Sequence, residues 1–212
     1  MSRPSLARKR RAELIAALMR ALAERGYAGA SVASIAREAK LAPGLVHYYF
    51  GSKQEILLEL LESIRAAILV RRDERLARAG DDPRAKLFAL TDALLEHDPS
   101  GGTAPVEATW VVIAAEAVHQ QPVRQAYGAM LLELVDRLEA GLREVLRAEG
   151  RRARDVRSLA AAIAAAVQGV YQMDAAAPGA AKRGSSAPAL RQMVAGLIEA
   201  QPRRRSRSKR TR

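Results

Sequence analysis

Residues 31–53 read SVASIAREAKLAPGLVHYYFGSK, and this stretch decides the fold of the N-terminal part of the chain. Ser31 is a helix-capping residue, and apolar side chains follow it at helical spacing. A break around residues 40–43 precedes a second short helix that ends at Phe50. Two short helices joined by a tight turn, behind a supporting helix predicted for residues 6–25, are typical of a three-helix helix-turn-helix unit.

The second short helix, about Pro43 to Phe50, is unusually aromatic. His47, Tyr48 and Tyr49 follow one another, and a helix that served only the core would not need all three around its circumference. Some of them must face solvent, where a phenol or an imidazole can bond a phosphate or a base edge. We expect Phe50 in the core and Tyr49 on phosphate, whereas His47, Tyr48 or both could face outward.

A capping box opens the next helix. In Ser52-Lys53-Gln54-Glu55 the serine hydroxyl can meet the amide three residues on, and the glutamate can reach back. Lys53 lies in the first turn, where its charge and the local backbone amides can both meet a phosphate. The helix is expected to end near Gly80.

The rest of the chain also reads as helix, because alanine and leucine dominate, aromatic residues are only 4% and no stretch alternates at period two. We therefore predict an all-α fold of nine helices, three in the basic N-terminal part and six in the body. The predicted ranges are 6–25, 31–39, 43–50, 52–80, 83–97, 104–119, 122–148, 154–174 and 188–200. Loops are expected at 98–102 and 175–187, and residues 202–212 should be disordered.

Positive charge is segregated along the chain. Of the formal net charge of +12, residues 1–53 carry +7, residues 203–212 carry another +7, and the residues between them carry −2. This placement indicates a polyanionic partner, nucleic acid first and an anionic membrane surface second. The plainer alternative is a solubilising surface.

Several classes of protein are disfavoured. The chain has no cysteine, and its three histidines, His47, His97 and His119, show no metal-ligand spacing. No phosphate loop or nucleotide-binding fingerprint occurs, so we expect neither an enzyme nor a cofactor. No run of 18 apolar residues and no signal-peptide pattern occurs, so we expect a cytoplasmic protein without a membrane partner.

The segment from Ser31 to Ala39, followed in register by Pro43 to Lys53, resembles the DNA-binding signature of the TetR family of one-component transcriptional regulators. The likeness covers roughly residues 10–60. It implies an all-α homodimer in which each N-terminal domain reads half of a double-stranded DNA operator and each C-terminal domain binds a small-molecule effector. The implied parts are a DNA-binding domain (1–53), a ligand-binding and dimerisation domain (54–201) and a basic tail (202–212).

The resemblance also implies which positions contact DNA. They are Ser31, Lys40, Pro43, Gly44, Leu45, His47, Tyr48, Tyr49 and Lys53. Two residues depart from the family pattern. Lys40 stands where the family usually turns on glycine, and a lysine in a left-handed conformation costs about 1 kcal/mol. Ala42 replaces the turn serine, which removes one hydroxyl contact to phosphate.

The helix predicted for 104–119 suggests an effector pocket. It carries the only tryptophan, Trp110, with an acid one turn earlier that could help to cage a cation. This stretch, with the segment from Pro122 to Tyr127, resembles the choline-sensing branch of the family; a core role for Trp110 is the favoured alternative. The candidate ligand-binding residues are Glu107, Trp110, Ile113, Ala114, Tyr127, Gln168 and Tyr171.

The last two long helices, 154–174 and 188–200, are the expected dimer interface. Residues 159–170 are almost all small, which lets helix axes approach closely, and in the family these helices form a four-helix bundle with a second subunit. The alternative is an alanine-rich helix buried within one chain.

Basic residues also flank the folded part. Arg3, Arg8, Lys9, Arg10 and Arg11 could reach the DNA backbone or the minor groove, or they could form a solvated terminus. For residues 203–212 we favour a solvated tail over weak, non-specific attraction to nucleic acid.

The leading hypothesis is a ligand-responsive DNA-binding regulator, most simply a repressor that an inducer releases from its operator. Activators share the motif, so the sequence leaves the direction of control open. The alternative is a basic helical protein that binds nucleic acid or anionic membrane without sequence specificity.

Overall fold

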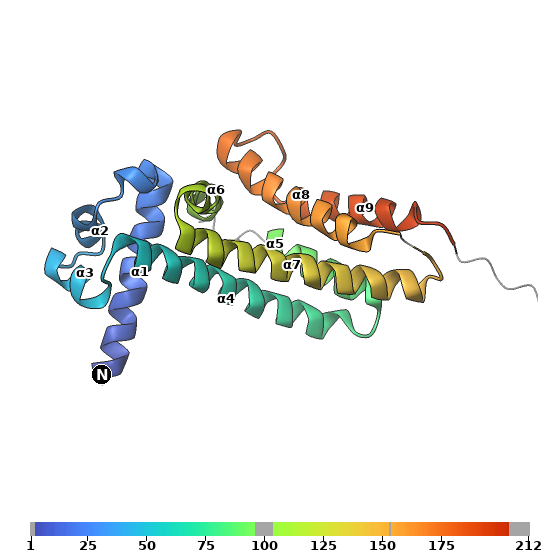
Figure 1. The fold of residues 1–212 in the computed structure, drawn as a ribbon, viewed down its shortest axis with the longest axis horizontal. Helices are drawn as coiled ribbons and strands as arrows, with labels where there is room; N and C mark the ends of the chain where they lie inside the picture. Colours follow the sequence, from blue (N-terminus) through green and yellow to red (C-terminus); the bar gives the residue numbers. More distant parts are fainter. Residues whose placement is uncertain (1–2, 96–103, 153, 204–212) are drawn as a thin grey trace, which may run out of the picture. The chain divides into compact units, whose positions relative to one another are not determined.

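The computed structural model describes residues 3–95, 104–152 and 154–203, which form nine helices and no β-strand (Figure 1). The all-α prediction is therefore confirmed for the described residues. The helices are α1 (Arg3–Gly29), α2 (Val32–Glu38), α3 (Pro43–Tyr49), α4 (Lys53–Ala79), α5 (Pro83–Leu95), α6 (Ala104–His119), α7 (Gln121–Ala148), α8 (Val156–Ala176) and α9 (Ser186–Glu199). The loop predicted at 98–102 lies outside the described residues. The disorder predicted for 202–212 is wrong for residues 202–203, because the Pro202 carbonyl accepts a hydrogen bond from the Arg152 amide at 2.8 Å and Arg203 pairs with Arg151 in an antiparallel bridge. Residues 204–212 lie outside the described residues.

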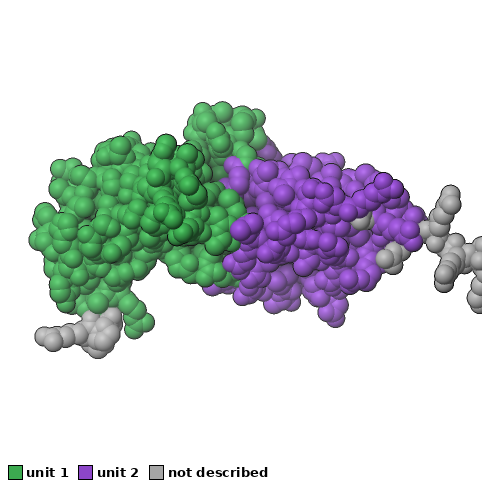
Figure 2. All heavy atoms as spheres, viewed as in Figure 1, with its two compact units in different colours: residues 1–69, 97–131, 169–181 green, residues 70–96, 132–168, 182–212 purple. Residues whose placement is uncertain are grey.

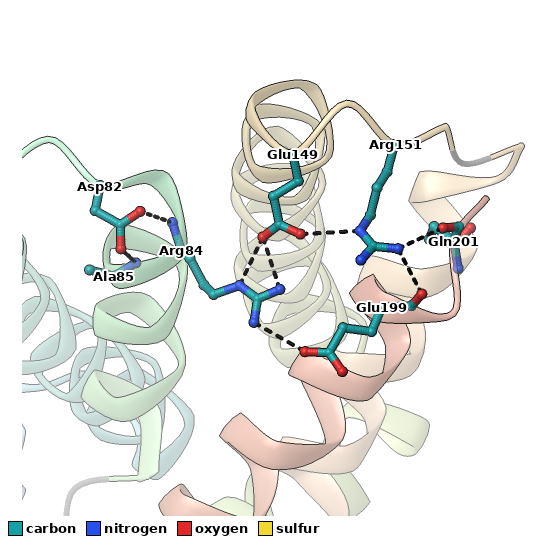
Figure 3. Close-up of polar contacts among 7 residues, drawn as sticks. All are labelled: Asp82, Arg84, Ala85, Glu149, Arg151, Glu199 and Gln201. Atoms are coloured by element: carbon teal, nitrogen blue, oxygen red, sulfur yellow. Dashed lines mark hydrogen bonds and ion pairs between the residues drawn. The ribbon is translucent and has the colours of Figure 1, made fainter. Parts of the chain in front are cut away.

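Capping residues fix where α4 and α5 begin. The Ser52 hydroxyl accepts a hydrogen bond from the Glu55 amide (3.2 Å), and the Glu55 carboxylate accepts one from the Gly51 amide (2.7 Å). The predicted capping box is thus confirmed. Ahead of α5, the Asp82 carboxylate accepts hydrogen bonds from the amides of Arg84 (3.3 Å) and Ala85 (3.0 Å), as Figure 3 shows.

Helix α1 is longer than predicted at both ends. The helix is interrupted at Gly26, just after the predicted end at residue 25, because Gly26 has a positive φ (64°) with ψ −178°. One further helical turn follows and ends at Gly29. The hydrophobic pattern of α1 stops at Leu22, so the pattern does not predict that added turn.

The chain divides into two compact units, each assembled from segments that are far apart in sequence (Figure 2). Unit 1 contains residues 1–69, 97–131 and 169–181, and unit 2 contains residues 70–96, 132–168 and 182–212. Helices α4, α7 and α8 each contribute to both units. The predicted domain boundary after residue 53 stays a prediction.

In unit 1, α1 is the platform for the two short helices. It packs against α2, α3 and α6. Leu14, Leu18 and Leu22 of α1 are fully buried or nearly so, as are Ile35 of α2 and Val46 of α3. Because closely packed side chains resist displacement, this core holds α2 and α3 in a fixed position.

In unit 2, α5 packs against α9, and an ion pair joins them. The Asp92 carboxylate is only 4% exposed and accepts a hydrogen bond from Arg191 Nε at 2.8 Å, while Arg75 Nη1 lies 3.8 Å away. Two arginines thus compensate a buried charge that would be costly alone. Among the helices of the described ranges, none is long and apolar enough to cross a membrane.

Candidate nucleic-acid interface

The turn between α2 and α3 depends on one residue, Lys40. Its backbone is left-handed (φ 56°), as predicted from its place in the turn. The Lys40 amide donates to the Arg37 carbonyl (3.1 Å), and the Leu41 amide donates to the Ala36 carbonyl (2.9 Å). These two bonds form a Schellman motif, which normally uses glycine at this position. The motif stops α2 and reverses the chain into α3.

The start of α2 is equally well defined. Ser31 caps the helix as predicted, since its hydroxyl accepts a hydrogen bond from the Ser34 amide at 3.1 Å. Ser31 is exposed, and the first amides of α2 lie beside it. A helix N-terminus of this kind carries partial positive charge and suits a phosphate contact. That contact stays a prediction.

Helix α3 buries one side and exposes the other. Val46 is 1% exposed, and Phe50, just after the helix, is 2% exposed, which confirms the core position predicted for Phe50. The remaining side is open to solvent. Its exposed residues are Pro43, Gly44, Leu45, His47 and Tyr48.

The sequence left open whether His47, Tyr48 or both face solvent. In the structure both side chains are exposed. Tyr48 is 79% exposed. Tyr49 is half-buried, and its ring meets the Tyr48 ring edge-on with centroids 5.0 Å apart. The pair therefore presents two phenol groups at the end of α3. Whether they contact phosphate stays a prediction.

Arg11 holds the end of α3 in place. Its Nη1 donates to the Tyr49 carbonyl (2.6 Å), its Nε donates to Glu59 (2.9 Å), and its guanidinium lies 4.2 Å from the Phe50 ring centroid. The hydrogen bond to Glu59 raises the pKa of Arg11. Arg11 was expected to meet DNA or to lie in a solvated terminus, but in the structure its side chain bonds α3 and α4.

The other arm residues differ from Arg11. Arg10 pairs with Glu13 at 2.7 Å, whereas Arg8 and Lys9 are exposed. The side chain of Arg3 lies outside the described residues. Arg8 and Lys9 therefore remain the candidates for an arm that reaches DNA.

Lys53 is engaged within the protein. Its Nζ donates to the Tyr27 carbonyl at 2.6 Å and lies 3.9 Å from the centroid of the Tyr27 ring. Partial burial lowers the pKa of Lys53. A phosphate must therefore compete with Tyr27 for this ammonium group, and the predicted phosphate contact stays a prediction. The sequence could not reveal this partner, because a backbone carbonyl leaves no side-chain signature.

Gln120 joins the ends of three helices at the same place. The Gln54 amide donates to Gln120 Oε1 (2.7 Å), the Tyr27 hydroxyl shares a hydrogen bond with Gln120, and Gln120 Nε2 donates to Glu116. Tyr27 belongs to α1, Gln54 to α4 and Glu116 to α6. Sequence reasoning missed this junction because its members are polar residues far apart in the chain.

Three of the candidate effector residues lie together in unit 1. The Trp110 ring stacks on Tyr171 (centroids 5.8 Å apart) and lies 6.1 Å from Tyr127 at a tilt. All three side chains are less than 9% exposed. Burial raises the pKa of Tyr127 to about 12, so its phenol is neutral at physiological pH. The three aromatic residues come from α6, α7 and α8.

The other candidates are more varied. Ile113 is fully buried, and Glu107, Ala114 and Gln168 are half-buried. Gln168 belongs to unit 2, whereas the others belong to unit 1. A ligand-binding role for these four residues stays a prediction.

Comparison with known proteins identifies the chain. Residues 14–60 match the family model described as bacterial regulatory proteins, tetR family. The HTH-type transcriptional regulator BetI of Paraburkholderia phytofirmans is 31% identical over 163 residues, which are 76% of this chain and 80% of that protein. The chain belongs to the TetR family.

Solved structures agree with that assignment. A transcriptional regulator from Rhodococcus sp. Rha1 has a TM-score of 0.75 and 25% identity, covering 90% of this chain and 97% of that one. A regulator from Saccharomonospora viridis, solved in complex with choline, has a TM-score of 0.70 and 24% identity, covering 92% and 98%. The resemblance drawn from residues 31–53 is confirmed, and the protein is a TetR-family DNA-binding transcriptional regulator.

Proposed function

We propose that the protein is a homodimeric repressor that places α3 of each subunit in the major groove of a two-fold operator. A small molecule bound in the C-terminal part releases it. The exposed outer side of α3 carries this proposal: Val46 and Phe50 anchor the helix, while Tyr48 and its neighbours stay free of the core. A short helix on a rigid support is what major-groove reading requires.

The chemistry of this surface suits a duplex. The Tyr48 and Tyr49 hydroxyls can donate to or accept from phosphates and base edges, and His47 can do the same. Gly44 has open space where a side chain would begin, so the backbone of α3 can approach DNA closely. Leu45, 39% exposed, offers an apolar contact of the kind that a thymine methyl accepts.

Operator binding is tested with the DNA upstream of the protein's own coding region, in a gel-shift assay with random duplex as competitor. Tyr48→Ala and His47→Ala are each expected to weaken operator binding by about 10-fold or more. Val70→Ala removes a side chain that is 58% exposed on α4, outside α3 and outside the expected dimer interface, and is the matched control. Its affinity should equal that of the wild type.

Two results would contradict the proposal. Wild-type affinity in both α3 variants would remove α3 from the interface. Equal competition by operator and random duplex would favour the alternative, a basic protein that binds nucleic acid without sequence specificity.

Effector binding is proposed at the aromatic residues Trp110, Tyr127 and Tyr171. Aromatic faces attract quaternary ammonium groups, and this clustering supports a cationic effector of that class. The choline complex of the Saccharomonospora viridis regulator gives the same indication from a protein of the same fold. Glu107, one helical turn before Trp110, would add negative charge on α6.

Trp110 is the only tryptophan of the chain, so its fluorescence reports on this site alone. Choline is expected to change the emission saturably and to weaken operator binding. The neutral isostere 3,3-dimethylbutan-1-ol is the matched ligand control and should do neither. If both compounds act alike, the cationic class is wrong. If neither acts, choline is not the effector.

A further inference from the structure

Unit 2 contains a cavity of about 870 Å³ that is lined mainly by arginine. It lies among the last turns of α7, the segment that leads into α8 and the chain that follows α9. Among the described residues, no carboxylate lines it. Its lining residues are Arg143, Leu146, Arg147, Arg151, Arg152, Arg154, Val156, Gln201, Pro202 and Arg203.

Backbone hydrogen bonds build this cavity from two distant segments. Gly150 ends α7 with a left-handed turn (φ 64°), and the Arg151 amide bonds back to the Leu146 carbonyl at 2.8 Å. The Arg152 amide then donates to the Pro202 carbonyl at 2.8 Å, and an antiparallel bridge pairs residues 151 and 203. The cations before α8 are thereby held beside the cation after α9.

Two carboxylates beside the cavity, those of Glu149 and Glu199, already have partners, as Figure 3 shows. Glu149 accepts from Arg84 Nε (2.9 Å) and from Arg151 Nε (3.2 Å), and Glu199 lies 3.4 Å from Arg84 Nη1. Arg151 also donates to the backbone carbonyls of Glu199 and Gln201. This network fixes the base of the cavity.

The Asp155 carboxylate also has hydrogen-bond partners within the protein. It lies next to Arg154 in sequence, but its carboxylate accepts from the Ser158 amide (3.1 Å) and hydroxyl (2.6 Å) at the start of α8. These hydrogen bonds lower the pKa of Asp155. The carboxylate therefore serves as a helix cap.

Four arginines of the lining remain unpaired in the described part of the chain. Arg147, Arg152, Arg154 and Arg203 are exposed, and none of them makes an ion pair with a described carboxylate. Like charges gathered at one cavity repel one another, and an anion that bridges them relieves that repulsion. The planar guanidinium group binds phosphate through paired hydrogen bonds, so phosphate is the anion that suits this lining best.

We propose that this arginine cavity binds the phosphate backbone of double-stranded DNA without sequence preference, separately from α3. The sequence after Arg203 adds six more basic residues and no acid over residues 204–212. A cavity followed by a run of cations matches an extended polyanion, such as DNA, better than a single small one. No helix as exposed as α3 lines the cavity to read base edges, so the contact is electrostatic.

The lining argues against a lipid surface as the partner. Its large aliphatic residues, Leu146 and Val156, are buried at 4% and 5% exposure. The exposed large hydrophobic residues of the described part of unit 2, Val70, Leu132 and Met193, do not line it. A membrane-binding surface would instead combine its cations with apolar side chains that enter the interface.

The test measures the binding of full-length protein to a random-sequence duplex as a function of salt. The variant Arg147→Gln, Arg152→Gln, Arg154→Gln removes three uncompensated charges. The control Arg65→Gln, Arg137→Gln, Arg157→Gln removes three arginines that pair with Glu62, Glu133 and Asp136. The cavity variant should bind about 10-fold more weakly at low salt, and its slope of log affinity against log salt should fall by about 2 to 3. The control should match the wild type.

A footprint locates the contact. Phenylglyoxal modifies accessible arginines, and mass spectrometry reports the extent at each position. Random duplex should protect Arg147, Arg152 and Arg154 in wild-type protein and equally in the Tyr48→Ala variant, so this result is independent of operator reading by α3. Equal loss of binding in both triple variants, or no protection by DNA, would overturn the proposal. Protection by inorganic pyrophosphate or by phosphatidylglycerol vesicles but not by DNA would overturn it too.

Discussion

At the scale of single residues, Lys40 shows how one side chain sets the geometry of the DNA-binding unit. Its left-handed backbone closes the turn between α2 and α3, and a side chain in that conformation is strained. Lys40→Gly is therefore expected to raise the free energy of unfolding by about 1 kcal/mol and the melting temperature by about 2 to 4 °C. Differential scanning calorimetry measures both.

The control for Lys40 is an alanine substitution, which removes the charge and keeps the strain. Lys40→Ala should melt close to the wild type. Equal melting temperatures in the glycine and alanine variants would show that the turn is not strained. Operator binding by the two variants then reports the charge alone, because both lack the ammonium group.

At the scale of elements, α3 owes its orientation to a residue outside the DNA-binding motif. Arg11 of α1 bonds the last carbonyl of α3 and pairs with Glu59 of α4. Arg11→Ala should lower the melting temperature by several degrees and weaken operator binding, with little change in the salt slope because no phosphate contact is lost. Arg8→Ala removes the same charge from the exposed start of α1 and should leave the melting temperature unchanged. A lower salt slope in Arg11→Ala with unchanged stability would instead place Arg11 on DNA.

The helices were predictable because their ends carry local signals. Ser31 and Ser52 cap the helices that follow them, and each cap was expected from its sequence. The solvent-facing residues of α3 were only partly predictable. The sequence could not distinguish between His47, Tyr48 and both, and in this helix of seven residues both are exposed. The internal roles of Lys53 and Arg11 were not predictable, because each side chain bonds a backbone carbonyl contributed by a distant segment.

At the scale of the whole molecule, we propose that α8 and α9 form the dimer interface. Ala161, Ala162 and Ala165 of α8 are exposed in the single chain, as are Met193 and Gly196 of α9. Small and apolar side chains on exposed helix surfaces suit close packing against a second copy. Ala165→Glu is expected to give a folded monomer in sedimentation velocity and to abolish operator binding at nanomolar protein concentrations.

The matched control is Ala129→Glu, which adds the same charge at an exposed position of α7. It should remain a dimer. A dimeric Ala165→Glu variant of wild-type stability would move the interface away from α8.

The bond between Lys53 and Tyr27 has a consequence for how the two proposed ligands influence each other. A phosphate would have to draw the Lys53 ammonium group away from the Tyr27 carbonyl. The Tyr27 hydroxyl bonds Gln120, which follows α6. If effector binding beside Trp110 displaces α6, operator and effector act on the same junction, because Gln120 directly follows α6. Thermodynamic reciprocity then requires the operator to weaken effector binding by the same factor by which the effector weakens operator binding. The sensitivity of the protein to its inducer would therefore depend on how much of it is already bound to DNA.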